Sequence, residues 1–376
     1  MGKIDVRMAS SGLSGAAWCV FTLALFFGAD SLLFRTGWYD AYLEPDSSAG
    51  TLESQLYWLA SAPAAKVPEV LVIGDSRIAE GFSPRVASSA VGHSLHFWNF
   101  GIGGATPRVW YYALRAADPT RRRFSDIVIA LDNYSDKDWF ADFEDRVSDQ
   151  NYLVMRLGLG DCIDFTMSLH STALRHSALF GCLFRGMMLR PDVQSFLSNP
   201  AARIAHADDW DRNGLNYATD YTGMAENLTG LSVDWRHRTL HFPEGVNESR
   251  RTNVIRFVLQ EPVPQKGEVA RYRRRWLGGI LDLYKDSPTR LIFLQLPRGP
   301  LVNPKPFPEP SGVRFVDSAA HSPHVTVWPA DTFTDLERPE VFADGLHLNR
   351  EGRPIFSARL AEKLRETATS TSGAAR

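Results

Sequence analysis

The sequence predicts an α/β protein built on a doubly wound parallel sheet, with an N-terminal transmembrane helix and a large insertion after the third strand. Three observations lead to this prediction. Short β-branched runs alternate with helical patterns, polar residues follow several of those runs directly, and one early segment is apolar throughout. Alternating strands and helices favour a parallel sheet covered on both faces, with its site at the carboxyl ends of the strands.

The composition sets outer limits on the class of protein. The chain has 376 residues, of which 44% are hydrophobic and 22% are charged, as is typical of a globular protein with a sizeable core. Its 41 Lys and Arg residues nearly balance 43 Asp and Glu residues, for a formal net charge of −2. This balance argues against a histone-like protein, and we expect no nucleic-acid partner.

The apolar segment covers residues 8–29, which carry no charged side chain. At about 1.5 Å per residue, a helix of this length crosses a hydrocarbon core of about 30 Å. A cleaved signal peptide and a buried soluble helix are the alternatives. Lys3 and Arg7 precede the segment and mostly acidic residues follow it, so the remainder is expected outside the cytoplasm. We therefore expect a single-pass protein of the cell membrane, with a periplasmic domain in a Gram-negative cell.

The expected strands and helices follow one another in a regular order. The first strand is Val70–Ile73, a β-branched run that ends at Gly74. Further strands are expected over residues 93–100, 126–131, 290–296 and 325–328. Ser83-Pro84 and Thr106-Pro107 each predict a helix start, because Ser or Thr favours the N-cap and proline the first turn. A helix ending at Tyr284 and another over residues 352–364 complete the alternation.

These elements divide the chain into expected regions. They are an anchor over 1–35, a connector over 36–67, an α/β domain over 68–366 interrupted by an insertion over 134–267, and a disordered tail over 367–376. Aromatic and polar residues in the insertion, around Trp210, Trp235 and Tyr217 to Tyr221, suit either a carbohydrate platform or an ordinary surface. Cys162 and Cys182 form either one disulfide or two buried thiols.

Polar residues follow three of the expected strands. Gly74-Asp75-Ser76 would set a hydroxyl on a tight turn at a helix start, where backbone N–H groups can face a developing oxyanion. A glycine-rich turn over residues 99–104 follows the second strand and can bring a backbone N–H close to a substrate. Asp132-Asn133 follows the third strand, and its amide can donate another hydrogen bond.

A fourth polar motif lies just before the last helix. Asp344-Gly345-Leu346-His347 places a carboxylate three residues ahead of an imidazole. A serine is a weak nucleophile until an imidazole takes its proton, and the imidazole needs a carboxylate to hold its tautomer. Ser76, His347 and Asp344 can fill those three roles. The structural alternatives are a helix cap, a surface loop histidine and a turn acid.

In this order the motifs resemble the SGNH hydrolase superfamily, also called GDSL hydrolases, whose four blocks contribute Ser, Gly, Asn and His. The matching residues are Ser76, Gly104, Asn133 and His347. The resemblance covers about residues 68–135 and 285–366 and implies a flavodoxin-like sheet. It implies Ser76 as nucleophile, His347 as base, Asp344 as orienting acid, and an oxyanion hole of the Ser76 and Gly104 N–H groups with the Asn133 amide. The third block departs from the usual Gly-x-Asn-Asp.

An N-terminal anchor, an outward-facing domain and a long insertion resemble the membrane-anchored SGNH proteins of cell-envelope polysaccharide acylation, the DltD-like and alginate O-acetylation types. The resemblance implies a serine esterase or O-acyltransferase that acts on acyl, mainly O-acetyl, groups of an exported polymer. It also implies a membrane-bound O-acyltransferase as partner. The alternatives are a lipid or small-ester hydrolase, and a catalytically inactive assembly subunit.

Two further sets of residues are expected to be structural. The pairs His237 and His241, and His321 and His324, lack the HExxH context of a zinc site, so we expect no metal and no cofactor. The triplets over residues 121–123 and 273–275 are all arginine, and we expect solvated faces there.

Overall fold

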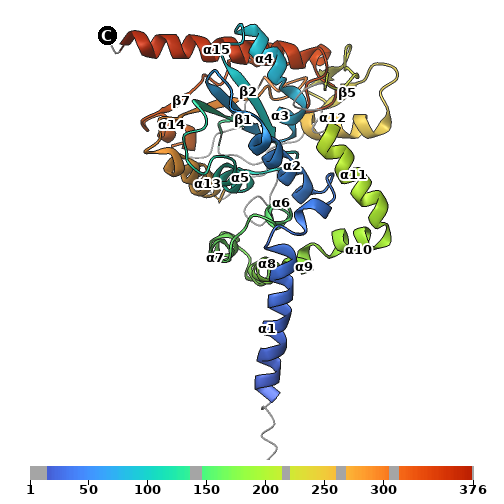
Figure 1. Ribbon diagram of the computed structural model, residues 1–376. Coiled ribbons are helices and arrows are strands. Elements are labelled where there is room, and N and C mark those ends of the chain that lie inside the picture. Colours follow the sequence, from blue (N-terminus) through green and yellow to red (C-terminus); the bar gives the residue numbers. More distant parts are fainter. Residues whose placement is uncertain (1–14, 136–145, 214–220, 260–267, 305–312, 375–376) are drawn as a thin grey trace, which may run out of the picture.

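The computed structural model describes residues 15–135, 146–213, 221–259, 268–304 and 313–374. Five parallel strands form its central sheet, in the order β2-β1-β3-β6-β7 (Figure 1). The strands are β1 (Glu69–Gly74), β2 (His96–Gly101), β3 (Asp126–Leu131), β6 (Arg290–Gln295) and β7 (Val325–Val327). The predicted parallel α/β architecture is therefore confirmed.

Helices cover both faces of this sheet, because successive side chains of each buried strand point to opposite sides. Leu71 and Ile73 of β1 belong to one core cluster, whereas Val70 and Val72 belong to the other. The first cluster includes residues of α2 (Ser48–Ser61), α5 (Pro107–Ala117), α13 (Glu268–Tyr284) and α14 (Phe315–Ala319). The second includes residues of α3 (Ser76–Gly81), α4 (Pro84–Ala90), α12 (Glu248–Leu259) and α15 (Gly352–Ala374).

The segment after β3 is a mainly helical insertion, as expected. Its helices are α6 (Asp149–Leu153), α7 (Leu159–Met167), α8 (Thr172–Leu183), α9 (Arg185–Met188), α10 (Arg190–Ser198), α11 (Pro200–Asn213) and α12. A two-stranded hairpin of β4 (Ser232–Asp234) and β5 (Thr239–His241) lies between α11 and α12. Cys162 and Cys182 form a disulfide that joins α7 to α8.

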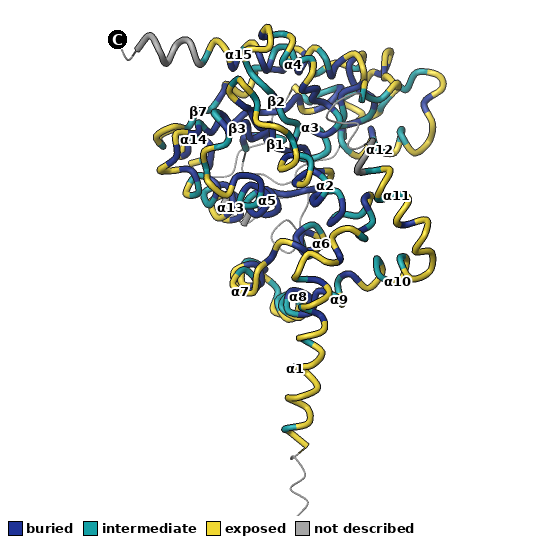
Figure 2. Tube along the Cα trace, viewed as in Figure 1, coloured by how far each residue is buried: buried dark blue, intermediate teal, exposed yellow. Residues whose placement is uncertain are grey.

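The N-terminal helix α1 (Gly15–Phe34) projects from the body of the molecule, and most of its length is exposed (Figure 2). It is long and apolar enough to cross a membrane. Its last turns are docked: the buried carboxylate of Asp30 accepts hydrogen bonds from the N–H groups of Arg185, at 3.0 Å, and Gly186, at 2.7 Å. The first residues of the expected span, 8–14, lie outside the described residues.

Several element bounds differ from those expected. Strand β2 begins at His96 rather than at residue 93, because Gly92 and His93 both have positive φ angles and form a turn. Strands β6 and β7 each end one residue early, although the N–H groups of Leu296 and Trp328 still bond to neighbouring strands. Short 3-10 helices lie at η1 (Asp40–Tyr42), η2 (Thr334–Leu336) and η3 (Pro339–Val341).

Two of the expected regions contain helical residues. The expected connector over residues 36–67 contains α2, whose Leu52, Leu56 and Leu59 are buried in the first core cluster. Helix α15 extends into the expected tail over 367–376, as far as Ala374.

Candidate active site

Ser76 lies where β1 passes directly into α3. It is the first residue of that helix, and the Asp75 carboxylate caps the helix by accepting a hydrogen bond from the Arg77 N–H at 2.9 Å. The turn requires glycine at position 74, because a Cβ there would lie 2.5 Å from a side-chain carbon of Ile78. The sequence thus places a serine hydroxyl at the carboxyl edge of the sheet and at a helix N-terminus.

The structure brings Ser76, His347 and Asp344 together. Nε2 of His347 lies 2.8 Å from Oγ of Ser76, and Nδ1 of His347 lies 2.9 Å from Oδ2 of Asp344. Asp344 is held in turn, since one of its oxygens accepts the N–H groups of Leu346 and His347 at 2.8 Å each. With the Nδ1 proton directed to Asp344, Nε2 is left to accept the hydroxyl proton of Ser76.

The electrostatics of the pair favour an ionised imidazole. Burial alone would lower the pKa of His347, but the hydrogen bond and charge of Asp344 outweigh it, so that pKa lies above its ordinary value. For Asp344, burial alone would raise the pKa. The hydrogen bond and charge of His347 outweigh that effect too, and the pKa of Asp344 is lowered. The carboxylate therefore stays charged while the imidazole gains a proton.

A second ion pair borders Ser76. Asp75 and Arg77 flank Ser76 in sequence and form a bidentate pair, with Nη2 of Arg77 at 2.7 Å from Oδ2 of Asp75. Burial alone would raise the pKa of Asp75, but the charge and hydrogen bonds of Arg77 lower it overall. The pair fixes α3 at its first turn. No sequence motif pointed to Arg77.

The glycine-rich turn after β2 also lies against Ser76. A Cβ on Gly103 would lie 3.9 Å from the Cβ of Ser76, and Gly104 has a φ of +71° that favours glycine. Tyr152 of α6 donates a hydrogen bond to the Gly103 carbonyl at 2.6 Å. Within the described ranges, the N–H groups of Ser76 and Gly104 donate no hydrogen bond.

Asn133 has different neighbours from the other predicted residues. Its amide donates to Oδ2 of Asp132 at 2.9 Å, and its side-chain oxygen accepts from Ser135 at 3.0 Å. In the part of the chain that the structure describes, no hydrogen bond joins Asn133 to Ser76. The assignment of Asn133 to an oxyanion hole therefore stays a prediction.

Arg273 holds the segment around Asn133 in place. Its guanidinium donates to the Asn133 carbonyl at 3.0 Å and to Oδ1 of Asp132 at 3.1 Å. The side chain is buried, so the expectation of a solvated face is wrong at this position. Sequence reasoning missed this role because the partners are 140 and 141 residues apart in the chain.

The insertion reaches the acid and base from another side. Asn253 of α12 accepts a hydrogen bond from the Gly345 N–H at 2.9 Å. A Cβ on Gly345 would lie 2.9 Å from the Cβ of Phe257, also in α12. The loop that carries Asp344 and His347 is therefore packed directly against the insertion.

Asn99 supports the site without belonging to it. Its amide donates to the carbonyls of Ile78, Ala79 and Phe82, at 3.0, 3.2 and 2.9 Å, at the end of α3. Its side-chain oxygen accepts the N–H of Gly101 at 2.9 Å. Asn99 thus joins the second strand to the helix that carries Ser76, and it is structural.

The predicted carbohydrate-type residues lie on separate elements. Trp210 is in α11, where His206 contacts its ring edge at a centroid distance of 6.2 Å, whereas Trp235 is beside β4 and packs on the second core cluster. His237 pairs with Asp234 at 2.6 Å on the exposed hairpin. Residues 217–220 lie outside the described residues.

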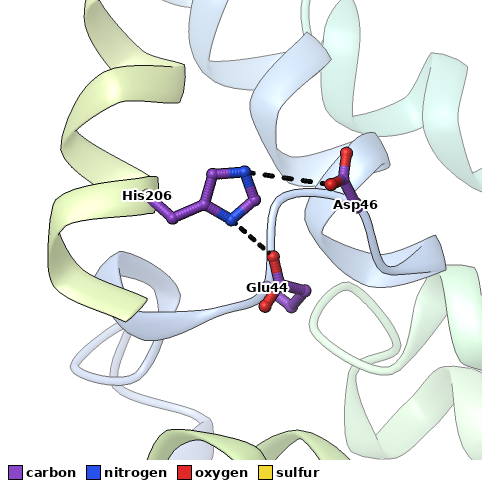
Figure 3. Close-up of side chains that lie close together, drawn as sticks. All are labelled: Glu44, Asp46 and His206. Carbon is purple, nitrogen blue, oxygen red and sulfur yellow. Dashed lines mark ion pairs between the residues drawn. The ribbon is translucent and has the colours of Figure 1, made fainter. Parts of the chain in front are cut away.

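Among the described residues, Glu44, Asp46 and His206 form the group that could hold a metal ion (Figure 3). The two carboxylates approach opposite nitrogens of the ring: Nδ1 lies 2.8 Å from Glu44 and Nε2 lies 3.8 Å from Asp46. In this structure the ring of His206 contacts both carboxylates, and Arg203 also pairs with Glu44, at 2.8 Å.

A cleft of about 960 Å³ opens at the opposite, amino end of the sheet. Its charged side chains are largely paired, with Arg123 on Glu69 at 3.2 Å and Arg290 on Asp126 at 2.7 Å. The cleft is separate from Ser76.

The fold and the site together define a parallel α/β protein with a Ser-His-Asp constellation at the carboxyl edge of its sheet. No protein-family model matches the chain, and the search of curated proteins found no match either.

Proposed function

We propose that the protein is a membrane-anchored serine esterase or O-acyltransferase of the SGNH type, acting on acyl groups of an exported polysaccharide or other envelope polymer. The observation that carries the proposal is the hydrogen-bonded chain from Ser76 through His347 to Asp344. This arrangement is suited to nucleophilic acyl transfer, in which an imidazole moves a proton off and back onto the reacting oxygens.

The topology supports the SGNH-type assignment. Counted within the sheet alone, the strand order is 2-1-3-4-5, which is the flavodoxin-like doubly wound order. In such sheets ligands bind at the carboxyl ends of the strands. Ser76 follows the first strand and the glycine turn follows the second, so both lie at that edge.

The reaction proceeds in two halves. Oγ of Ser76 attacks the acyl carbonyl carbon while its proton passes to Nε2 of His347, giving a tetrahedral oxyanion. The bond to the leaving alcohol then breaks, and that alcohol takes the proton from Nε2, which leaves an acyl ester on Ser76. A sugar hydroxyl or water next gives its proton to Nε2 and attacks the ester, and Ser76 recovers the proton.

The oxyanion needs donors that are already in place. The Ser76 N–H at the start of α3 and the Gly104 N–H in the adjacent turn fit that need, and each such donor is worth roughly 3–4 kcal/mol in a serine hydrolase. Asn133 is the third proposed donor. Since its amide binds Asp132, it would have to keep its second N–H for the substrate.

The position of α1 supports an uncleaved membrane anchor. Removal of α1 would leave the Arg185 and Gly186 N–H groups without the Asp30 carboxylate that they bind. The Cys162–Cys182 disulfide is consistent with an extracytoplasmic, oxidising compartment. An anchored domain outside the cytoplasm could receive acyl groups from a membrane-bound O-acyltransferase, which is the proposed partner.

The test is labelling by a fluorophosphonate, which reacts with activated serines. The full-length protein in detergent and the exposed-helix control Ser89→Ala should both label, and Ser76→Ala should not. A folded wild-type protein that does not label would favour the inactive assembly subunit. Labelling that survives in Ser76→Ala would place the nucleophile elsewhere.

A second experiment addresses the substrate. O-acyl content of the envelope polymer should change in a strain carrying His347→Ala and stay unchanged in one carrying His321→Ala, a surface histidine variant. Unchanged polymer in the His347→Ala strain, together with normal fluorophosphonate labelling of the wild-type protein, would favour a lipid or small-ester hydrolase.

A further inference from the structure

Helices α7–α10 of the insertion, here called the platform helices, expose large apolar side chains. On α7 these are Leu159, Ile163 and Met167, which are 50, 66 and 54% exposed. They are spaced four residues apart and so form one stripe along the helix. Phe180 on α8, Met187 on α9 and Leu197 on α10 are also more than half exposed. Apolar exposure on four successive helices indicates an interaction surface.

Helix α7 is fixed to its neighbours by both polar and apolar contacts. Two of its acidic residues bind arginines of neighbouring helices: Asp161 binds Arg115 at 2.7 Å, and Asp164 binds Arg275 at 2.9 Å. Cys162 and Phe165 are buried in the core. The apolar stripe on α7 is left without a described partner among the elements of the chain, although α7 itself is firmly fixed.

The platform helices lie near the C-terminal end of α1, where that helix meets the rest of the molecule (Figure 1). Phe184, between α8 and α9, stacks against two rings of the apolar part of α1, Phe26 at 5.3 Å and Phe27 at 6.0 Å. Asp30 of α1 caps α9 one turn further along. The junction of α8 and α9 therefore lies beside the apolar part of α1, and not only beside the residues that follow that helix.

We propose that the platform helices rest in the surface of the same phospholipid bilayer that α1 spans, with their apolar side chains at the boundary between headgroups and acyl chains. This inference rests on the proposed membrane anchoring of α1. A bilayer that surrounds α1 up to Phe26 reaches the level of Phe184. Helices lying in that plane bury their apolar faces about 5–10 Å deep.

Two other features fit this placement. Trp38, just after α1, is 55% exposed, and tryptophan favours the interfacial zone of membranes. The disulfide between α7 and α8 ties the stripe-bearing helix to the helix that contacts α1. The apolar stripe of α7 is thus held at a fixed position relative to α1. A subdomain that moved separately from α1 would not keep that position.

The experiment measures depth in the membrane with a fluorophore. In full-length protein carrying Cys19→Ser, single cysteines at Met167→Cys, Leu25→Cys and Ile355→Cys are labelled with NBD. The protein is placed in phosphatidylcholine–phosphatidylglycerol nanodiscs, one copy per disc, with and without lipids carrying a doxyl quencher. Leu25 reports on α1, and Ile355, in α15 at the far end of the body, is the exposed apolar control (Figure 1).

We expect the label at position 167 to lose most of its fluorescence to quencher lipids, as at position 25, and the label at 355 to lose none. Quenching at position 25 without quenching at position 167 would overturn the proposal that the platform helices lie in the bilayer surface. It would still support the proposed membrane anchor α1. Absence of quenching at both positions overturns the platform and the anchor together. In detergent, the label at position 167 could instead be shielded from solvent only when the protein runs as a dimer. That result would assign the surface to contact with a second copy and would also overturn the proposal.

Discussion

Oγ of Ser76 and Nε2 of His347 lie 2.8 Å apart although 271 residues separate them in the chain. The contact brings the end of the first strand to the loop before the last helix. The contact therefore depends on the assembly of segments from both ends of the α/β domain.

The pH dependence of Ser76 acylation should follow the protonation of His347. Only the neutral imidazole accepts the hydroxyl proton, so the rate should rise with pH. Because Asp344 raises the pKa of His347, the midpoint should lie above the ordinary imidazole value of about 6.5. The rate of fluorophosphonate inactivation at closely spaced pH values measures the midpoint. A rate independent of pH would contradict the role of His347 as base.

Replacement of the orienting acid should affect both rate and pH profile. Asp344→Asn removes the charge that raises the pKa of His347, so the midpoint should move to lower pH. It also lets the ring adopt the wrong tautomer, and the acylation rate should fall by roughly 10³–10⁴. Asp335→Asn, at an exposed carboxylate paired with Arg359, is the control and should leave both unchanged. A normal rate in Asp344→Asn would refute the orienting role.

Asn99 should matter for stability rather than for chemistry. Asn99→Ala removes the donors for three carbonyls at the end of α3 and the acceptor for Gly101, at a cost of roughly 1–3 kcal/mol per group left unsatisfied. The thermal unfolding midpoint in detergent should fall clearly. Asn151→Ala, at an exposed position in α6, should have little effect. Equal midpoints for the two variants would count against the proposed link between β2 and α3.

A buried ion pair provides another test of stability. Arg108 and Asp149 are fully buried 3.4 Å apart, and Arg108 lies over the rings of Phe165, Tyr272 and Trp276. Asp149→Ala removes this buried carboxylate from beside the Arg108 guanidinium and should cost about 3–5 kcal/mol. The double replacement Arg108→Met with Asp149→Leu should unfold at a higher temperature than Asp149→Ala alone. The opposite order would mean that Arg108 stabilises the fold through contacts other than Asp149, such as the three rings it lies over.

The sequence sufficed for features that depend on local patterns. Short apolar runs located the five strands of the sheet, and motif order selected Ser76, His347 and Asp344, which lie together in the structure. Strand bounds were less accurate, because turns such as that at His93 depend on backbone angles that many sequences tolerate.

Contacts between distant segments were missed. Nothing local predicts that Arg273 holds Asn133, or that Tyr152 binds Gly103, because each partner is chosen by tertiary packing. The leucines of α2 have the periodicity of any amphipathic helix, and only the fold shows that they pack on the sheet.

The capping of α9 by Asp30 has a consequence for biosynthesis. The carboxylate is translated 155 residues before the Arg185 N–H that binds it, an interval of roughly 8–30 s at ordinary elongation rates. During that time the end of the apolar helix lacks this contact with α9. The orientation of α1 relative to the body is therefore fixed late in synthesis, after the middle of the insertion has been made.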